Sequence, residues 1–403
     1  IKNMAIIESN NNQYLAVGII KLCGLEAVEA VFGFDERNKI VRKLCQRIAE
    51  KYAQCCDIVT FNADLYLLLC RENVQTFTRK IATVNDFDSS FGYRNLRIHK
   101  SAICEPLQGE NAWSYAEKLK LAISSIRDHM FSEFIFCDDA KLNEIEENIW
   151  IARNIRHAME IGELFLVYQP IVDINTRTIL GAEALCRWVS AERGIISPLK
   201  FITIAEDIGF INELGYQIIK TAMGEFRHFS ERAVLKDGFL LHINVSPWQL
   251  NEPHFHERFT TIMKENGLKA NSLCVEITET VIERINEHFY LNIEQLRKQG
   301  VRVSIDDFGT GLSNLKRFYE MNPDSIKVDS QFTGDIFGTA GKIVRIIFDL
   351  ARYNRIPVIA EGVESEDVAR ELIKLGCVQA QGYLYQKPMP FSAWDKSGKL
   401  VKE

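Results

Sequence analysis

The sequence predicts an α/β protein in which a C-terminal (β/α)8 TIM-like barrel follows a smaller α/β domain. Three observations lead to this prediction. The chain has 403 residues, more than one ordinary hydrophobic core accommodates. From about residue 160 onwards, apolar runs of strand length alternate with amphipathic stretches of helical length, which is the pattern of a mostly parallel sheet. The alternation gives eight apolar runs, and eight repeats favour a closed barrel over an open doubly wound sheet.

The predicted barrel strands are short and mainly apolar. They cover residues 164–172, 179–189, 239–245, 272–278, 302–306, 325–329, 356–360 and 377–384. In one of the predicted helices, Phe289, Ile293 and Leu296 recur at helical spacing before Gly300 ends it. Another helix is predicted at 340–354. No GxGxxG motif follows the first strand, which argues against a dinucleotide-binding fold.

The first ~140 residues have a different pattern, typical of a smaller α/β unit. We predict a strand at 14–22, a helix at 36–52 and a hairpin at 57–70 that turns at Asn62 and Ala63.

A charged stretch at 140–163 contains no proline and predicts a helical connector between the domains. We therefore place the first domain at 1–145 and the second at 146–403.

Composition excludes several classes of protein. The chain is 47% hydrophobic and 25% charged, as expected for a soluble globular protein. Its net charge of -6 provides no basic surface for a nucleic acid duplex. No stretch reaches the ~18 apolar residues that span a bilayer.

The ten cysteines show no CxxC pair and no metal-ligand spacing; Cys55 and Cys56 are adjacent and the others are scattered. We expect reduced core residues and a cytoplasmic location. The chain begins with Ile1 rather than Met, and we expect it to be part of a longer protein in which a sensor or an inner-membrane anchor lies upstream.

Polar side chains recur at the ends of the predicted strands. In chain order they are Glu183, Asn244, Glu276, Glu279, Asp306, Asp307, Lys327, Glu361, Glu364 and Gln381. In a closed barrel the C-terminal strand ends meet at one mouth, where active sites form. So many carboxylates would repel one another unless divalent cations lay among them, and oxygen donors suit Mg2+ or Mn2+. The series therefore predicts a metal-dependent enzyme.

Adjacent Asp306 and Asp307 precede the glycine-containing turn FGTG. Each of the two carboxylates is able to bind one of two ions that lie about 3.5–4 Å apart, which is the spacing found in two-metal phosphoryl chemistry. Lys327 would then orient or deprotonate the attacking water, with its charged form disfavoured by the nearby cations.

Each of these residues alone has a structural explanation. Asp306 and Asp307 could cap a turn, Glu183 could cap a helix, and Asn244 could satisfy backbone groups at a strand end. Capping gives no reason for polar residues to recur at strand after strand, so the whole series favours a functional site.

The motifs EALCRW, INVS, EITE, DDFGTG, KVD, AEGVE and QGY occur in this order between residues ~150 and 392. In order and spacing this half resembles the EAL-type cyclic-di-GMP phosphodiesterases. The resemblance implies hydrolysis of one 3'-5' phosphodiester of cyclic-di-GMP to linear pGpG. It also implies two Mg2+ or Mn2+ ions per active site and a homodimer formed through this domain.

The resemblance also assigns roles to individual residues. It implies one ion held by Glu183, Asn244, Glu276 and Asp306, and a second held by Asp306, Asp307 and Glu361. It implies catalytic roles for Lys327, Glu361 and Glu183, with the nucleophilic water at Lys327. It implies that Glu279 supports the loop after Asp307, and that the dinucleotide contacts Gln169, Arg187, Glu364 and Gln381.

The first domain resembles a GGDEF-type diguanylate cyclase in its strand and helix order, but its motif residues differ. The hairpin that would carry GGDEF reads Asn62-Ala63-Asp64-Leu65-Tyr66. Lys21 and Cys23 stand where that family carries acidic residues, and a lysine repels the cation that it should bind. Gln54 takes the arginine place of the inhibitory site that ends at Asp57. The resemblance therefore implies an inactive domain with a regulatory or scaffolding role.

Two other functions remain open for the whole chain. One is a receptor that binds cyclic-di-GMP without hydrolysing it and signals to a partner protein. The other is an interaction scaffold that ignores the dinucleotide. A receptor is expected to have lost some of Glu183, Glu276, Asp307, Lys327 and Glu361, and all five are present, which favours the enzyme.

Overall fold

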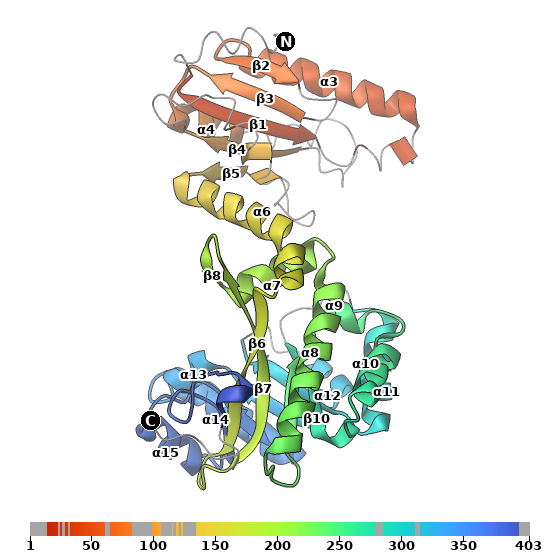
Figure 1. Ribbon diagram of the computed structural model, residues 1–403. Helices are drawn as coiled ribbons and strands as arrows, with labels where there is room; N and C mark the ends of the chain where they lie inside the picture. The colour runs from red at the N-terminus through yellow and green to blue at the C-terminus, as the bar shows by residue number, and fades with distance from the viewer. Residues whose placement is uncertain are drawn as a thin grey trace. The chain divides into compact units, whose positions relative to one another are not determined.

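The structure, a computed structural model, divides into two compact units, Ile1–Trp150 and Ile151–Glu403 (Figure 1). The residues that it describes are 14–22, 25, 29–30, 33–60, 65–82, 99–105, 115, 118–120, 122–123, 134–278, 285–310 and 315–394.

The first unit contains a five-stranded sheet in the order β2-β3-β1-β4-β5. Strand β1 is antiparallel to β3 and β4, whereas β4 and β5 run parallel. The elements are β1 (Ala16–Leu22), α3 (Phe34–Tyr52), β2 (Cys56–Thr60), β3 (Leu65–Cys70), α4 (Val74–Ala82), β4 (His99–Cys104), β5 (Phe134–Cys137) and α6 (Asp139–Glu160). The predicted first strand, the long helix and the two arms of the hairpin are confirmed. The hairpin's turn at Asn62 and Ala63 lies outside the described residues.

This sheet is buried on both faces. All six residues of β3 are buried, with alternate side chains entering opposite clusters, as the two-residue period of a strand requires. Tyr66, Leu68 and Cys70 pack with α3 and α4, and Leu67 and Leu69 pack on the other face. The fully apolar run of β3 therefore reflects its central position.

Helix α6 covers most of the predicted connector at 140–163, and it crosses from one unit to the other at Trp150. No helix in the part of the chain that the structure describes is sufficiently long and apolar to cross a membrane.

The second unit is an eight-stranded barrel with one additional strand. Its strands are β6 (Leu164–Asp173), β7 (Ile179–Ser190), β8 (Gly194–Ile196), β9 (Leu240–Asn244), β10 (Leu273–Thr278), β11 (Arg302–Phe308), β12 (Ser325–Val328), β13 (Val358–Ala360) and β14 (Gln379–Ala380). Its helices are α7 (Pro198–Asp207), α8 (Ile211–Arg232), α9 (Pro247–Leu250), α10 (Phe255–Glu265), η2 (Ala270–Ser272), α11 (Glu287–Gln299), α12 (Leu315–Met321), α13 (Ser330–Gly334), α14 (Ala340–Asn354), α15 (Glu366–Lys374) and η3 (Phe391–Ala393).

The ring order is β6-β14-β13-β12-β11-β10-β9-β7, and pairing of β6 with β7 closes it. All eight predicted strands are present, so the predicted barrel is confirmed. One strand departs from the simple parallel pattern, because β6 is antiparallel to both β7 and β14. Only residues 174–178 join β6 to β7, and a parallel crossover needs a dozen residues or more. The first predicted strand pair is therefore a hairpin.

The long hairpin changes where two of the predicted site residues lie. Strand β7 pairs with β9 over Gly181–Ala184 and with β8 over Trp188–Ser190, so it continues past the ring. Gln169 and Glu183 are register partners within this hairpin. The prediction that each polar residue stands at a strand end is therefore wrong for Glu183.

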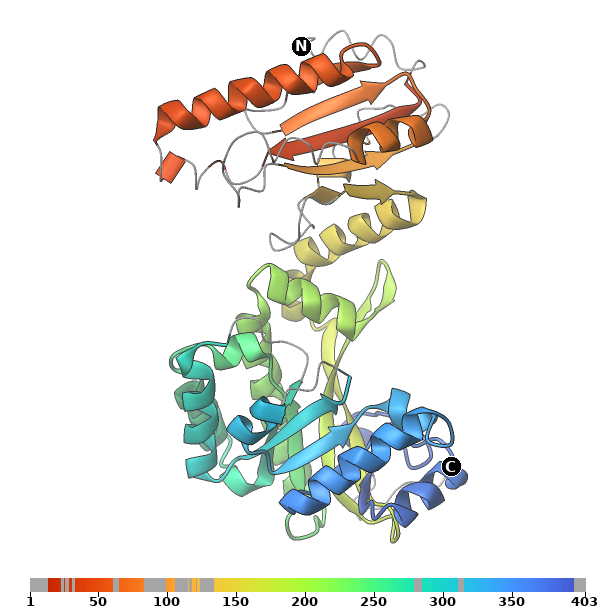
Figure 2. The ribbon, with the colours of Figure 1, turned by 180° about the vertical axis from the view of Figure 1, so that it is seen from behind.

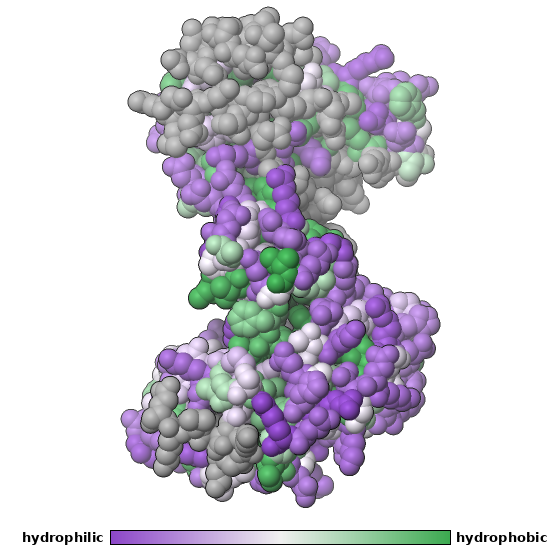
Figure 3. Space-filling model, in the orientation of Figure 1, coloured by the Kyte–Doolittle hydropathy of each residue, from purple (hydrophilic) through white to green (hydrophobic). Residues whose placement is uncertain are grey.

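Helices surround the barrel on its outside (Figure 2). Helix α11 begins after Asn286, whose side chain accepts a hydrogen bond from the His288 amide, and ends at Gly300 with φ 97°. Phe289 and Leu296 are fully buried against the barrel, as their spacing predicted. The visible face of this unit over α8, α10 and α11 is mainly hydrophilic (Figure 3), because the apolar stripes of these helices face inward.

Candidate functional site

Register brings the predicted polar residues of neighbouring strands to the same level of the barrel. Glu183 of β7 is level with His242 of β9, and Asn244 is level with Glu276 of β10. Gly181 permits β7 to approach β9, because a Cβ there would lie 2.5 Å from the Leu240 carbonyl oxygen.

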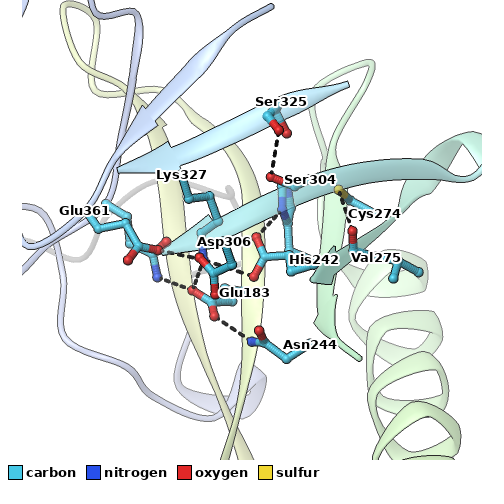
Figure 4. A network of polar contacts seen from close by, with 12 residues as sticks. Glu183, His242, Asn244, Cys274, Val275, Ser304, Asp306, Ser325, Lys327 and Glu361 are labelled. Atoms are coloured by element: carbon cyan, nitrogen blue, oxygen red, sulfur yellow. Dashed lines mark hydrogen bonds and ion pairs between the residues drawn. The ribbon is translucent and has the colours of Figure 1, made fainter. Parts of the chain in front are cut away.

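The ammonium of Lys327 lies at the centre of this group (Figure 4). The side chain is fully buried, although lysine is rarely buried unless paired. Its Nζ is 2.6 Å from Glu361 Oε1, 2.9 Å from Glu276 Oε2, 3.0 Å from Glu183 Oε2 and 3.2 Å from Asp306 Oδ1. Four carboxylates from four strands or strand ends thus share one buried cation.

Burial and charge set the pKa values of this cluster. Burial lowers the pKa of Lys327, but attraction to the surrounding carboxylates outweighs it, so this pKa lies well above its ordinary value. Burial raises the pKa of Glu276 and that of Glu361 well above the usual range. For Glu183, the Lys327 charge and hydrogen bonds from Gln381 and Asn244 overcome burial and lower the pKa to about 2.

Amide side chains also hold Glu183. Asn244 donates from Nδ2 to Glu183 Oε1 at 2.8 Å. Gln381 donates from Nε2 to Glu183 Oε2 at 2.8 Å and to Gln169 Oε1 at 2.9 Å. Gln381 itself follows β14, and its backbone N–H donates to the Ala360 carbonyl. The next residue is Gly382, which lets the backbone pass close to Val363.

A break in strand β11 brings two adjacent carboxylates to one side. The register shifts between Ile305 and Phe308, and Asp307 has φ 54°, a conformation that non-glycine residues adopt rarely. Successive residues of a regular strand face opposite sides. The bulge lets Asp306 and Asp307 face the same site, and burial together with the Asp306 charge raises the pKa of Asp307 to about 7.

The carboxylates form two groups that share one member. Oxygens of Glu183, Glu276 and Asp306 lie within 4.8 Å of one another, as do oxygens of Asp306, Asp307 and Glu361. Asp306 Oδ1 is buried and lacks a hydrogen-bond partner within the described part of the chain, although Lys327 Nζ is 3.2 Å away. All donors are carboxylate oxygens, which suit a hard divalent cation. These residues therefore fit the predicted pair of ions.

The other predicted residues have different surroundings. Gln169 is buried and donates to the Gln386 carbonyl oxygen at 3.2 Å. Arg187 is half-buried and donates to the Cys186 carbonyl at 2.9 Å, and its spacing of four from Glu183 puts it on the same face of β7. Glu364 is exposed, and Glu279 lies outside the described residues.

Two residues of the cluster were missed in the sequence. His242 is buried and lies 2.7 Å, through Nδ1, from Glu276 Oε1; in the tautomer that carries its proton on Nδ1, the histidine donates to an ionised Glu276. Asp329 lies near Asp307 and helps to raise its pKa, and it caps α13. Both stand two positions from a predicted residue, at Asn244 and Lys327, so the two-residue strand period is the signal that could have found them.

Comparison with known proteins identifies the second unit. The model of the EAL domain family matches residues 152–388, which is more than half of the chain. The chain belongs to the EAL domain family. The matched segment contains the barrel and every carboxylate around Lys327.

Relatives of this EAL domain protein include longer chains. The chain is 98% identical over 403 residues to the "Probable cyclic di-GMP phosphodiesterase PdeI" of Escherichia coli (strain K12), covering all of this chain and 52% of that protein. It is 26% identical over 388 residues to the "Bifunctional diguanylate cyclase/cyclic di-GMP phosphodiesterase MucR" of Pseudomonas aeruginosa, covering 94% of this chain and 56% of that protein. The chain thus spans about half the length of these relatives.

Solved structures support the same family. The "PaMucR Phosphodiesterase, c-di-GMP complex" has 30% sequence identity and a TM-score of 0.56, and the match covers 60% of this chain and 98% of that chain. The "cAMP and cyclic-di-GMP bound form" of "EAL Enzyme Bd1971" has 28% identity and a TM-score of 0.59, and the match covers 73% of this chain and 79% of that chain.

We predict that His242 positions Glu276 for metal binding. His242→Leu removes the hydrogen bond to Oε1, and affinity for Mn2+ is expected to fall about 10- to 100-fold, as when other outer-shell partners of metal ligands are lost. Isothermal titration calorimetry of the full chain measures this without reference to turnover. The conservative variant His242→Gln, which keeps a donor, is expected to recover part of the affinity. Equal Mn2+ affinity in His242→Leu and the parent chain would show that the histidine only fills space.

Proposed function

We propose that the chain hydrolyses cyclic-di-GMP to linear pGpG in a reaction that depends on two Mg2+ or Mn2+ ions. The observation that carries this proposal is the pair of carboxylate groups that share Asp306. Membership of the EAL domain family supports it, as does the 98% identity to a probable cyclic-di-GMP phosphodiesterase.

Charge balance supports two dications rather than one. Among the described residues, Glu183, Glu276, Asp306 and Glu361 contact the buried Lys327 ammonium, and Asp307 lies next to Asp306 and Glu361, so five carboxylates share one ammonium. With every group ionised, the cluster carries four negative charges in excess, which is the charge that two dications neutralise. Burying uncompensated charge is costly, so bound ions would stabilise the ionised cluster.

Bound dications would polarise a water molecule and stabilise negative charge on the attacked phosphate. Glu183, Asn244, Glu276 and Asp306 would hold one ion, and Asp306, Asp307 and Glu361 the other. The chain's own contribution is to fix these donors through Lys327 and the amides of Asn244 and Gln381 before substrate arrives. Such preorganisation is the main source of electrostatic catalysis.

In the proposed reaction, water oxygen bonds to one phosphorus and the bond from that phosphorus to a 3' oxygen breaks. Lys327 orients the attacking water; the water gives up one proton as its oxygen bonds to phosphorus, and the leaving 3' oxygen takes up one proton in exchange, so the proton count balances. Glu361 is the carboxylate nearest to the Lys327 ammonium, so it would share in the hydrogen bonding of this water. One cyclic bond is cut, which gives linear pGpG.

Gln169, Arg187, Glu364 and Gln381 would contact the dinucleotide. Oε1 of Gln381 is buried and, within the described part of the chain, has no hydrogen-bond partner. Arg187 lies four residues along β7 from Glu183, and planar guanidinium groups suit phosphate oxygens. The related PaMucR phosphodiesterase was solved as a c-di-GMP complex, which supports the same ligand class here.

The proposal is tested by incubating the purified chain with cyclic-di-GMP and Mg2+ or Mn2+ and separating the products by chromatography. We expect pGpG, its loss with a chelator, and its recovery when Mn2+ is restored. Glu183→Gln keeps the size of the side chain but removes its charge, and turnover is expected to fall by roughly 10²-fold or more. Glu257→Gln changes an exposed glutamate on α10 and serves as the matched control. Full turnover by Glu183→Gln would exclude Glu183 from the metal site.

A second prediction separates catalysis from binding at Lys327. With metal present, Lys327→Met is expected to lower kcat about 10²- to 10⁴-fold, the range for a proton-handling group, and to change the Kd for cyclic-di-GMP far less. Turnover and calorimetric binding are measured on the same preparation. Equal losses in both would give the lysine a binding role. Binding without turnover by the parent chain would instead support the receptor function.

For the first unit, we propose a GGDEF-like fold that no longer makes cyclic-di-GMP and has a regulatory or scaffolding role. The match to a bifunctional cyclase and phosphodiesterase extends over 94% of this chain, which supports the relationship. Asp57 already accepts hydrogen bonds from Tyr14 at 2.7 Å and Arg71 at 2.6 Å, so internal contacts occupy it. Cys23 and Asp64 lie outside the described residues.

We predict no cyclase activity in the full chain. The Glu183→Gln variant, which preserves any product, is incubated with GTP and Mg2+, and the mixture is searched for cyclic-di-GMP by mass spectrometry. We expect none, because Lys21 repels the cation that cyclisation needs. An active cyclase in a parallel reaction verifies detection. Formation of cyclic-di-GMP by the variant would contradict an inactive first unit.

We also propose that two copies of the chain associate through the EAL domain. Helix α14 exposes Ile343, Ile346 and Tyr353, of which Tyr353 is 83% exposed, and Phe337 just before it is 68% exposed. Exposed apolar side chains gathered on one helix face are typical of interaction sites. In the longer protein, an upstream sensor or membrane anchor would act on this pair of EAL domains.

A further inference from the structure

Three cysteine thiols converge in the first unit, away from the carboxylate cluster. The sulfur atoms of Cys55, Cys56 and Cys70 all lie within 4.8 Å of one another, and the Cys55 and Cys56 sulfurs are 3.6 Å apart. All three side chains are buried, and Cys70 is fully inaccessible. The group therefore forms one compact site rather than three separate core positions.

Backbone geometry brings adjacent Cys55 and Cys56 to the same side. Cys55 lies in the turn after α3, and Cys56 is the first residue of β2. Because Cys55 is not part of the strand, the two side chains need not point to opposite faces of the sheet. Their side chains enter the same apolar cluster. Cys70 ends β3 and is the direct register partner of Cys56, and cross-strand partners have neighbouring side chains. The pairing of β2 with β3 therefore places the third sulfur next to the other two.

The spacing matches a thiolate-bound ion. Three sulfurs that each bind one zinc-sized ion at about 2.3 Å are about 3.8–4.0 Å apart, and the observed separations span this value, with 3.6 Å for one pair and 4.8 Å as the upper limit. Within the described residues, the group contains no carboxylate or imidazole donor. A donor set of sulfur alone selects soft ions such as Zn2+ or Cu(I) over Mg2+ or Mn2+.

Cys70 also differs electrostatically from other core thiols of this unit. A hydrogen bond from Cys56 and one from the Glu72 backbone amide lower the pKa of Cys70 to about 7, against the effect of burial. Burial raises the pKa of Cys104 well above its usual range and that of Cys137 to about 11. The hydrogen bond to Cys70 and burial raise the pKa of Cys56, and burial raises that of Cys55, so the thiolate, which is the form that binds metal, is favoured at Cys70 alone before an ion binds. At Cys55 the positive charge of Lys80 opposes the effect of burial only in part.

We propose that Cys55, Cys56 and Cys70 form a binding site for one soft d10 cation, of the class of Zn2+ and Cu(I). A disulfide between Cys56 and Cys70 is the competing use of these thiols, but it would leave Cys55 without a role. The ion would join the start of β2 to the end of β3 and so fix the hairpin between them. This inference is independent of the proposed function.

The test uses the full chain, reduced and kept without oxygen, in excess Mg2+ so that the carboxylate site is occupied. Titration with Cd2+ is followed by the ultraviolet sulfur-to-metal charge-transfer band, which carboxylate ligands do not produce. We expect saturation at one ion per chain. Displacement by Zn2+ in one arm and by Cu(I) in another identifies the preferred ion.

Variants define the ligands. Cys55→Ala is expected to lower the band by about one third, because one of three sulfur bonds is lost, and the double variant Cys56→Ser, Cys70→Ser is expected to abolish it. Cys104→Ser, a buried cysteine of the same sheet on β4, is the matched control and should keep the full band. Absence of the band in the parent chain, or its survival in the double variant, would overturn the proposal.

A measurement on the parent chain covers the case of a variant that does not fold. Pulsed alkylation in mild denaturant, followed by peptide mass spectrometry, is expected to show that Zn2+ slows modification of Cys55, Cys56 and Cys70 but not of Cys104. Equal slowing at all four cysteines would mean general stabilisation and would contradict the site. Finding a Cys56–Cys70 disulfide in place of ion-dependent protection would likewise contradict it.

Discussion

The second unit depends on one buried ion cluster, in which the Lys327 ammonium lies between carboxylates from across the barrel. Removing one partner from a buried ion pair typically costs about 3–5 kcal/mol, because the remaining charge has no compensation. Here four carboxylates lie within 3.2 Å of the ammonium. Neither the ammonium nor the carboxylates could be buried without the opposite charge. The strands must keep their register for these contacts to form. The cluster therefore links the geometry of the barrel to the chemistry at its mouth.

The reversed strand β6 completes the cluster in a way that eight parallel strands would not. Because β6 and β7 form a hairpin, Gln169 is the direct partner of Glu183, and β14 pairs with β6 on the other side. Gln381 at the end of β14 then reaches both of these residues. The Lys327 charge and the amide groups together hold Glu183 ionised, with a pKa of about 2, whereas Glu276 and Glu361 have raised pKa values. One carboxylate of the cluster is thus fixed as an anion, and the others respond more readily to bound cations.

Much of the fold could be predicted from the sequence, because apolar runs and helical periodicity report burial directly. The strands of the barrel and helix α11, with Phe289 and Leu296 inward, follow from such patterns. The direction of β6 cannot be predicted in this way, because an apolar run has the same composition in either direction. The site series was visible as a recurrence of carboxylates, whereas the role of His242 was not, since it depends on how β9 and β10 pair and so on the contact between His242 and Glu276. The φ of Asp307, which makes the bulge, likewise depends on pairing with β12.

Each unit has a proposed ion site at which the alternation of a strand is interrupted. In β11 a bulge turns Asp306 and Asp307 toward the same site, and in the first unit the turn before β2 does the same for Cys55 and Cys56. In each case a residue from another strand completes the set through register, and in each case the adjacent pair in the sequence would normally face opposite sides. The two sets differ in donor chemistry, oxygen in one and sulfur in the other, so they would select different ions. Adjacent identical side chains at a strand irregularity are therefore stronger indicators of a site than the same residues within a regular strand, because the irregularity is what lets them converge.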